Sequence, residues 1–311
     1  MLDRFRERFA RRARREPRPA RVLPSDLLAR VRRIEISTKR LVDQGVAGSY
    51  HSVFRGRGME FSEVRPYQPG DDVRSIDWNR TARMGVPYVK QFVEERDLTV
   101  FLVVDVSGSL RFGSRAILKR ELAAEISALL AFAALRNQDR VGAALVSDRL
   151  ELFLPPQRRR NQVLRLVDEI LSRPAAGRTD LDAALHEALS NLRQRAVLFV
   201  VSDFVGPAPI GALQRAAARH DVVLLELVDP RDIDVPAVGP VVLEDAETGA
   251  VALYDGRRSA LAESARARAE RQQLRDLAGG LGIDRVELRT DRPYLPELVG
   301  FFDRRKRRMA R

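Results

Sequence analysis

Cysteine is absent from this chain of 311 residues, histidine occurs only three times and tryptophan once. Without cysteine the protein forms no disulfide bond, and no thiolate is available as a nucleophile. His51, His186 and His220 are not spaced as a metal-binding pair, and none of them lies beside a candidate nucleophile. The sequence therefore gives little support to catalysis and predicts a protein that is not an enzyme.

Long apolar runs are missing as well. No segment has the roughly 20 consecutive apolar residues that a membrane-spanning helix needs, and the amino terminus lacks the apolar central region of a secretory signal. We therefore expect a cytoplasmic protein, with peripheral membrane contact left open. Apolar residues nevertheless make up 45% of the chain, which is enough for a sizeable core in one or two domains.

The net charge of +12 is concentrated at the two ends of the chain. Nine arginines against three acidic residues give residues 1–21 a net charge of +6, and residues 303–311 carry +5, so the body is nearly neutral. Blocks of like charge at termini are commonly solvated interaction tails. Leu2, Phe5 and Phe9 share one helical stripe, so the first tail could also lie on an anionic membrane surface. No nucleic-acid motif accompanies the arginines, so no specific nucleic-acid partner is expected.

Residues 105–109 read Asp-Val-Ser-Gly-Ser and directly follow the apolar run of residues 98–104. Hard oxygen ligands thus gather at the end of a predicted buried strand. Magnesium takes oxygen ligands in near-octahedral geometry and keeps several waters. Asp105, Ser107 and Ser109 therefore predict a site for magnesium, or for manganese, with one position open to a partner's oxygen. The alternative for each residue alone is a helix N-cap or a turn former.

Two further oxygen-bearing residues follow in later loops. Thr179 opens a helical pattern, and Asp203 comes shortly after the apolar run of residues 197–201. Taken singly, each fits a helix cap as well as a ligand. Ligands of open α/β sheets bind outside the carboxyl ends of the strands. Thr179 and Asp203 therefore lie where that rule expects a ligand to bind.

Strand and helix patterns alternate along the chain, which predicts an α/β fold with a mostly parallel sheet and helices on both faces. Residues 141–146 and 150–154 are separated by a connection too short for a parallel crossover, so they should form an antiparallel hairpin at a sheet edge. A second small hairpin is expected at residues 241–244 and 251–254. The other strands are expected at residues 98–104, 196–201, 222–228 and 283–288, and the helices at residues 115–136, 161–171, 180–192, 210–219 and 257–278.

The Asp-x-Ser-x-Ser pattern of residues 105–109 resembles the metal-ion-dependent adhesion site (MIDAS) of von Willebrand factor A domains. Thr179 and Asp203 stand where the second and third metal loops of that family supply a threonine and an aspartate. The resemblance covers residues 98–302 and implies a Rossmann-like fold. It also implies that the two serines and usually the threonine contact the ion, whereas the two aspartates mostly hold its waters.

The segment before this domain carries a second resemblance. Its motifs are similar to the signature of the bacterial family known as domain of unknown function 58: residues 57–61 (Arg-Gly-Met-Glu-Phe), 65–67 (Arg-Pro-Tyr), 69–74 (Pro-Gly-Asp-Asp-Val-Arg), 76–78 (Ile-Asp-Trp) and 81–83 (Thr-Ala-Arg). In that family the signature leads into an A-type domain, and an AAA+ ATPase of the MoxR type is often encoded nearby. The resemblance implies such an ATPase as a partner, but it brings no known reaction with it.

Without the family, the signature is a segment dense in turn formers and in charges of alternating sign. A solvated network of weak ion pairs, a docking face and a brace against the A-type domain all fit this pattern. Trp78 is expected to anchor the segment, because large aromatic side chains mostly contribute buried area, and residues 86–93 should form a strand. Four parts are therefore expected: a basic tail (1–21), a subdomain with the signature (22–97), an A-like domain (98–302) and a second basic tail (303–311).

These patterns predict a magnesium-dependent protein-interaction module that acts as an adaptor or co-factor of a MoxR-type ATPase, in assembly or chaperone-like work. A carboxylate of the partner would fill the open metal position. Two other classes stay open. One is a metal-dependent phosphoryl-transfer enzyme that relies on Asp105, although Ser107 stands where the haloacid dehalogenase pattern needs a second aspartate. The other is an anion-binding module driven by the basic tails, whose binding would depend steeply on salt.

Overall fold

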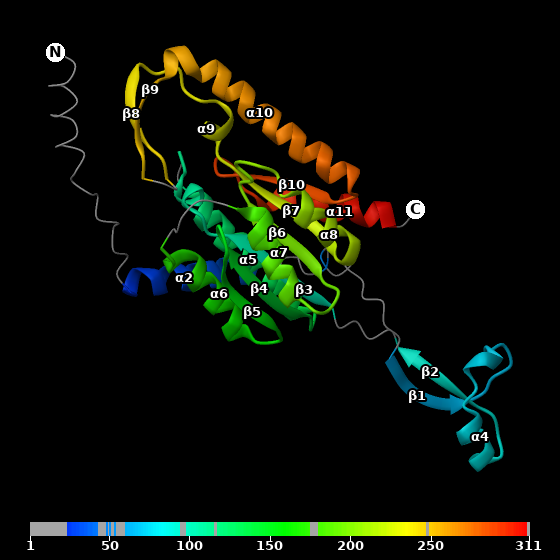
Figure 1. Cartoon of the computed structure of the whole chain (residues 1–311). Coiled ribbons are helices and arrows are strands. Elements are labelled where there is room, and N and C mark those ends of the chain that lie inside the picture. The colour runs from blue at the N-terminus through cyan, green and yellow to red at the C-terminus, as the bar shows by residue number, and fades with distance from the viewer. Residues whose placement is uncertain are drawn as a thin grey trace, which may run out of the picture.

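A six-stranded sheet forms the centre of the protein (Figure 1). The computed structural model describes residues 24–42, 48, 50, 53, 60–93, 98–114, 117–174, 180–246 and 249–309. From one edge to the other, the strands are β10 (Asp284–Arg289), β7 (Asp221–Val228), β6 (Val197–Ser202), β3 (Thr99–Asp105), β4 (Arg140–Val146) and β5 (Leu150–Gln157). All neighbours are parallel except β4 and β5, which form the antiparallel edge hairpin. The predicted α/β class with a mostly parallel sheet is confirmed.

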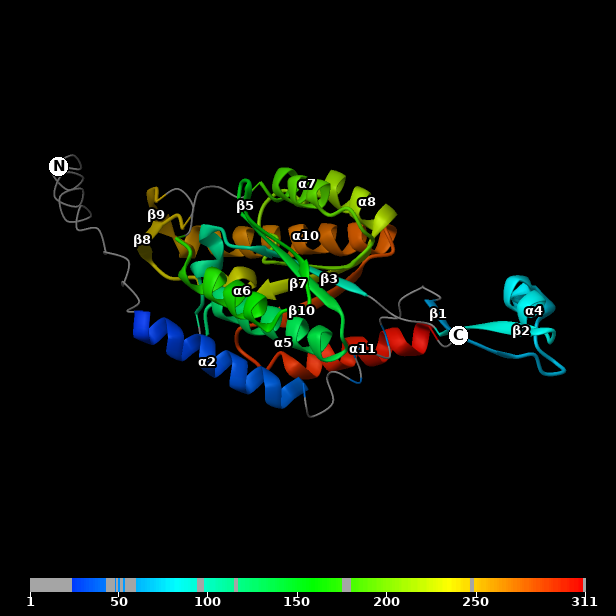
Figure 2. The same ribbon diagram turned by 90° about the horizontal axis from the view of Figure 1, so that it is seen from below.

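Two helical layers enclose this sheet (Figure 2). One layer contains α2 (Pro24–Leu41), α5 (Lys119–Arg136), α6 (Arg160–Ser172) and α11 (Leu295–Met309), and the other contains α7 (Leu181–Asn191), α8 (Ile210–Arg219) and α10 (Gly256–Gly280). Successive side chains of a strand point to opposite faces of the sheet. Leu102 of β3 therefore packs against the layer that contains α5, and Val103 packs against the layer that contains α7. Because both faces are covered, β3 is buried along its whole length and apolar from Val100 to Val104.

α5 is buried around most of its circumference, as expected for a helix that is enclosed on all sides. It packs against α6 and α2, and Val31 and Ile34 of α2 belong to the same buried cluster as the α5 side chains. The first helix of the predicted range 22–97 therefore packs against the sheet domain, because the apolar side chains of α2 are buried there.

α5 begins at Lys119, four residues later than predicted. The carboxylate of Glu121 accepts a hydrogen bond from the Leu118 N–H (3.1 Å), which closes the first turn. Just before this turn, Ser114 donates hydrogen bonds to Asp229 at the end of β7, from its N–H (2.8 Å) and its hydroxyl (2.5 Å). These bonds hold Ser114 outside the helical path.

Residues 303–309 were expected in a solvated tail and instead continue α11. Arg305 is 12% exposed and forms ion pairs with Asp221 and with Asp284 (2.7 Å), so these two carboxylates hold the basic turn in place. The other basic tail, residues 1–21, lies outside the described residues. Within the described chain, no helix combines the length and the apolar character that crossing a bilayer requires.

The signature segment forms a small unit that stands away from the sheet domain in Figure 1. Strands β1 (Glu60–Pro66) and β2 (Tyr88–Val93) pair in antiparallel fashion around the short helix α4 (Trp78–Met84). β2 agrees with the strand predicted at residues 86–93. The prediction that Trp78 is a buried anchor is wrong: its side chain is 66% exposed, because it opens α4 on a unit with little interior of its own.

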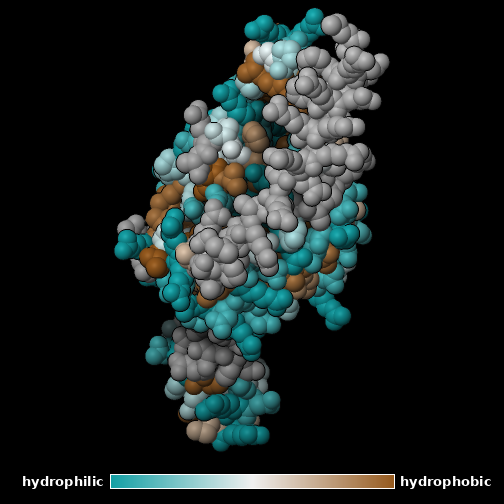
Figure 3. Space-filling model, turned by 90° about the vertical axis from the view of Figure 1, so that its left-hand side faces the viewer, coloured by the Kyte–Doolittle hydropathy of each residue, from teal (hydrophilic) through white to brown (hydrophobic). Residues whose placement is uncertain are grey.

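The second predicted hairpin is confirmed as β8 (Pro240–Glu244) and β9 (Val251–Asp255). It leads into α10 and keeps several apolar side chains in contact with solvent, among them Leu253 (76% exposed), and Leu261 of α10 is also exposed (83%). Figure 3 shows brown apolar surface at the top of the view, the end at which this hairpin lies.

Candidate functional site

Asp105 is the last residue of β3, and its side chain is 1% exposed. One carboxylate oxygen accepts a hydrogen bond from the Ser107 N–H (2.8 Å), and the other accepts one from the Ser202 hydroxyl (2.7 Å). Ser202 ends β6, which runs parallel to β3, so the carboxyl ends of both strands meet here. Burial and then the nearby Asp203 carboxylate raise the pKa of Asp105 to about 6. The protein alone therefore compensates this charge poorly.

Ser107 and Ser109 turn their hydroxyl groups toward each other, with 3.0 Å between the two Oγ atoms. Ser107 precedes the short 3-10 helix η3 (Gly108–Arg111), but its side chain makes no capping hydrogen bond to that helix. Ser107 thus occupies the N-cap position, but its hydroxyl does not cap the helix and stays available for another contact. One buried and one half-buried hydroxyl oxygen stand next to the Asp105 carboxylate.

Asp203 is bonded to a buried lysine. Lys119 is 2% exposed, and its Nζ lies 2.6 Å from Asp203 and 3.2 Å from Asp232, which belongs to α9 (Pro230–Ile233). Burial opposes the charge on Lys119, but the attraction of Asp203 and then of Asp232 outweighs it and raises the pKa of the ammonium group above its ordinary value. The charged lysine thus ties α5, β6 and α9 together at this end of the sheet.

Four of the five predicted site residues come together here: Asp105, Ser107, Ser109 and Asp203. Thr179 lies outside the described residues and stays a prediction. In the part of the chain that is described, no group of three or more His, Cys, Asp or Glu residues is arranged to hold a metal ion. An ion at this place would therefore depend on the serine hydroxyls.

Sequence reasoning missed three members of the site: Lys119, Ser202 and Asp232. Ser202 could have been found, because it directly precedes a predicted site residue at the end of a strand. Lys119 lies in a segment predicted as helix, where a lysine normally faces solvent. Asp232 follows a strand that carried no motif, and no spacing in the sequence links it to Asp203.

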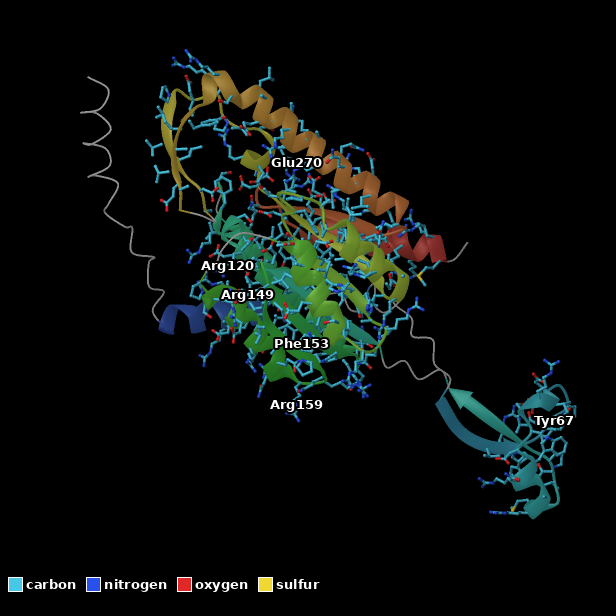
Figure 4. The ribbon with its side chains drawn as sticks, viewed as in Figure 1. Tyr67, Arg120, Arg149, Phe153, Arg159 and Glu270 are labelled. Carbon is cyan, nitrogen blue, oxygen red and sulfur yellow. The ribbon has the colours of Figure 1, made fainter. Side chains whose placement is uncertain are left out.

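A cavity of about 320 Å³ adjoins Asp203 and Asp232. The loop after β6, α9 and α10 form its walls, and Glu270 of α10 is labelled in Figure 4. Phe204 in that loop has a φ of 50°, a left-handed conformation that is uncommon for a residue other than glycine. Side chains of both charge signs line the cavity, including Arg231, Glu263, Arg266, Glu270 and Arg271, so it suits a polar ligand.

A family model described as "Protein of unknown function DUF58" matches residues 63–275. Two similar proteins are the uncharacterized protein Mb1516 of Mycobacterium bovis and the uncharacterized protein Rv1480 of Mycobacterium tuberculosis. Each is 36% identical over 286 residues, which cover 90% of both chains. The uncharacterized protein YeaD of Bacillus subtilis is 29% identical over 115 residues, which cover 37% of this chain and 27% of YeaD.

Two solved structures are similar at lower identity. The conserved hypothetical protein BatB from Bacteroides thetaiotaomicron is 15% identical with a TM-score of 0.40, covering 68% of this chain and 99% of BatB. The SpRpn10 VWA domain is 14% identical with a TM-score of 0.37, covering 65% of this chain and 93% of that domain.

Proposed function

We propose that this chain, which belongs to the DUF58 family of proteins of unknown function, is a protein-interaction module whose partner binds through a magnesium ion. The oxygen-bearing side chains at the carboxyl ends of β3 and β6 support this proposal. Asp105, Ser107, Ser109 and Asp203 would hold the ion together with Thr179. When bound, the ion would offer a position open to an oxygen atom of the partner.

The convergence of Asp105, Ser107, Ser109 and Asp203 at one end of the sheet carries this proposal, and the spacing of the two serine hydroxyls is compatible with it. In an octahedral magnesium site the ligand oxygens lie about 2.0–2.1 Å from the ion, so neighbouring ligands are about 3.0 Å apart. The Oγ atoms of Ser107 and Ser109 are joined by a hydrogen bond of 3.0 Å, so the two hydroxyls already lie at the separation that neighbouring ligands of such a site would keep. The donor set consists of oxygen atoms alone, which suits magnesium or manganese rather than metals that prefer nitrogen or sulfur.

The local charge supports a divalent cation. Asp105, Asp203 and Asp232 bring three carboxylates, and Lys119 brings one ammonium group. The guanidinium group of Arg120 also acts on Asp105, but without a hydrogen bond from its Nε or Nη2 atom. A divalent cation that contacts the carboxylates directly would offset their charge and would lower the pKa of Asp105 toward its ordinary range.

The partner that we propose is an AAA+ ATPase of the MoxR type, as the family resemblance implies. A carboxylate on its surface would take the open position of the ion, and the module would act as its adaptor or co-factor. The basic residues 1–21 would add peripheral contact with an anionic membrane to an otherwise cytoplasmic protein.

The geometry disfavours the alternative of phosphoryl transfer by Asp105. Both of its carboxylate oxygens already accept hydrogen bonds, from the Ser107 N–H and from the Ser202 hydroxyl. A nucleophile needs an oxygen directed at the reacting atom. Both oxygens of Asp105 are instead engaged in holding the loop and the neighbouring strand.

The proposal is tested by measuring affinity for the candidate ATPase, with wild type and Asp105→Ala, in magnesium and in chelator. We expect tight binding only for wild type in magnesium. A matched control is Val242→Ser on β8, which exposes 54% of its side chain and lies on the hairpin. It should bind like wild type. Equal affinity of wild type and Asp105→Ala in both solutions would reject recognition through the metal and would direct attention to the exposed signature around Trp78.

A further inference from the structure

Arg120 is a buried cation that the proposed metal site does not use. It follows Lys119 in the first turn of α5, and its side chain is 7% exposed. Its Nε and Nη2 atoms are buried and have no hydrogen-bond partner within the described residues. A charged group that is removed from water without a partner is strongly unfavourable. Lys119 has two carboxylate partners that offset its buried charge, whereas the Nε and Nη2 atoms of Arg120 have none within the described residues.

The two unpartnered atoms form one recognition edge of the guanidinium group. Nε and Nη2 carry N–H bonds that point in the same direction, and together they donate two parallel hydrogen bonds to two oxygens of one acidic group. This edge matches a carboxylate or a phosphate, whereas a single carbonyl oxygen would satisfy only part of it. The chemistry of the unpartnered atoms thus points to an oxyanion.

The charged neighbours of Arg120 do not offset the positive charge at this edge. Burial and then the neighbouring arginines Arg111 and Arg173 lower the pKa of Arg120 to about 10, and Asp105 acts in the opposite direction. The group is still charged at neutral pH. Arg173 has its own carboxylate partner in Glu169 (2.6 Å), and both oxygens of Asp105 accept other hydrogen bonds. Neither Glu169 nor Asp105 therefore accepts a hydrogen bond from the Nε or Nη2 atom of Arg120.

We propose that the Nε and Nη2 edge of Arg120, labelled in Figure 4, binds an oxyanion of the carboxylate or phosphate class beside Asp105. The inference deepens the proposed function and rests on it in one respect, namely that the oxyanion belongs to the partner protein. The binding itself needs only the guanidinium group. It can therefore be measured in chelator, separately from any metal.

The test uses the full chain in chelator and follows its thermal unfolding midpoint. Sodium acetate and sodium phosphate are titrated against sodium chloride at equal ionic strength. At about tenfold excess over the dissociation constant, the bound anion should raise the midpoint by roughly 3 to 6 °C. Arg120→Met should lose this response. Its midpoint in chloride should equal or exceed that of wild type, because the substitution removes a buried charge that lacks a partner.

Arg215→Gln removes the charge of an exposed arginine on α8 and serves as the control, which should respond like wild type. If Arg120→Met does not fold, the side-chain Nε–H resonance of Arg120 in the wild-type protein should shift on addition of acetate or phosphate and not of chloride. A response to one anion alone would identify the class of acid.

Two results would overturn the inference: an equal response of wild type and Arg120→Met, or no response beyond chloride in either measurement. The metal proposal is judged separately. A protein that is insensitive to magnesium but responds to acetate through Arg120 would refute the metal site and support the oxyanion site.

Discussion

Lys119 holds two carboxylates of the candidate site at once, Asp203 and Asp232. Removing one partner of a buried ion pair leaves the other charge uncompensated, which costs about 3 to 5 kcal/mol. We therefore expect Lys119→Met to lower the free energy of unfolding by about that amount in denaturant titrations carried out in chelator. Lys39→Met is the control: this lysine is 53% exposed and pairs with Glu35 at 3.5 Å, so its loss should cost less than about 1 kcal/mol. Similar losses in both variants would mean that Lys119 is not an essential counter-charge.

Ser107 and Ser109 allow the metal proposal to be tested without any partner. A ligand that binds only the folded protein stabilises it by mass action, so magnesium at about a hundredfold excess over its dissociation constant should raise the unfolding midpoint by roughly 5 to 10 °C. The double variant Ser107→Ala, Ser109→Ala should fold and lose this shift, while Ser190→Ala, on the exposed side of α7, should keep it. An unchanged shift in the double variant would place the ion elsewhere.

Asp139 predicts a dependence of stability on pH at the opposite end of the strands. It is 2% exposed, and its carboxylate accepts a hydrogen bond from the Tyr50 hydroxyl (3.3 Å). Burial raises its pKa to about 7, although hydrogen bonds from Tyr50 and the Leu98 backbone oppose the shift. The folded protein therefore keeps this proton well above the pH at which the unfolded chain loses it. The stabilisation is complete below about pH 4 and is lost as the pH rises to about 7.

We expect Asp139→Asn to remove this loss, because the amide stays neutral at every pH. Its free energy of unfolding relative to wild type should rise between pH 4 and pH 8, by up to about 4 kcal/mol. Denaturant titrations at pH 4.5, 6 and 8 measure the difference, with Asp276→Asn on the exposed face of α10 as the control. Parallel pH profiles for wild type and Asp139→Asn would show that Asp139 is ionised in the folded protein.

At the scale of helices and strands, the sequence predicted those elements well whose residue types are determined by burial alone. β3 is apolar from Val100 to Val104 and β6 from Val197 to Val201, because both faces of a parallel sheet are covered. Asp105, Ser107, Ser109 and Asp203 could be predicted together for the same reason, since they follow those strands directly. Lys119 and Asp232 could not, because only the folded chain shows that the first turn of α5 and the loop after β7 meet at Asp203.

α11 shows that a pattern of charge alone does not predict whether a segment is folded or solvated. Its last turns contain mostly basic residues, which in isolation predict a solvated tail. The acidic partners are Asp221 and Asp284, which begin strands β7 and β10, and their position beside α11 is a property of the tertiary structure. Trp78 was expected to be buried and is exposed, because an aromatic side chain is buried only if its unit has an interior that can hold it.

Arg305 tests whether these ion pairs stabilise α11. It is 12% exposed and reaches both Asp221 and Asp284, whereas Arg307 on the same helix is exposed. Arg305→Gln should lower the free energy of unfolding by about 1 to 2 kcal/mol, because the pairs are partly shielded from solvent. Arg307→Gln should change it by less than about 0.5 kcal/mol. Denaturant midpoints of the two variants compare them directly, and equal values would restore the view of residues 303–309 as a solvated tail.

For the whole molecule, the sheet domain brings the residues of the candidate site together at one end. Asp105, the serine pair, Lys119 and the cavity beside Asp203 all border on the carboxyl ends of the central strands. This is where open α/β sheets bind their ligands. The signature unit, in contrast, exposes Trp78 and has little buried surface of its own. A partner protein would therefore find two different surfaces, a polar one on the sheet domain and a partly apolar one on the signature unit.

Variants of α2 test how much of the amino-terminal part the sheet domain needs for its stability. Ile34 is 7% exposed and packs in the cluster that contains α5, whereas Ile36 on the same helix is 58% exposed. Ile34→Ala should lower the free energy of unfolding by about 2 to 4 kcal/mol, because it leaves a cavity in the core. Ile36→Ala should cost less than about 1 kcal/mol, mainly through local helix effects.

Truncation extends the same argument from one side chain to the complete helix. Removal of residues 1–21 should leave the denaturant midpoint unchanged, because so charged a segment has little to bury. Removal of residues 1–42 takes away Val31, Ile34 and Val42, which are all buried, and uncovers α5, a helix that is apolar around most of its surface. The longer truncation should therefore unfold at a distinctly lower denaturant concentration and expose apolar surface to a hydrophobic dye. If both truncated chains are as stable as the full chain, α2 does not belong to the sheet domain, and the boundary predicted at residue 97 would be correct.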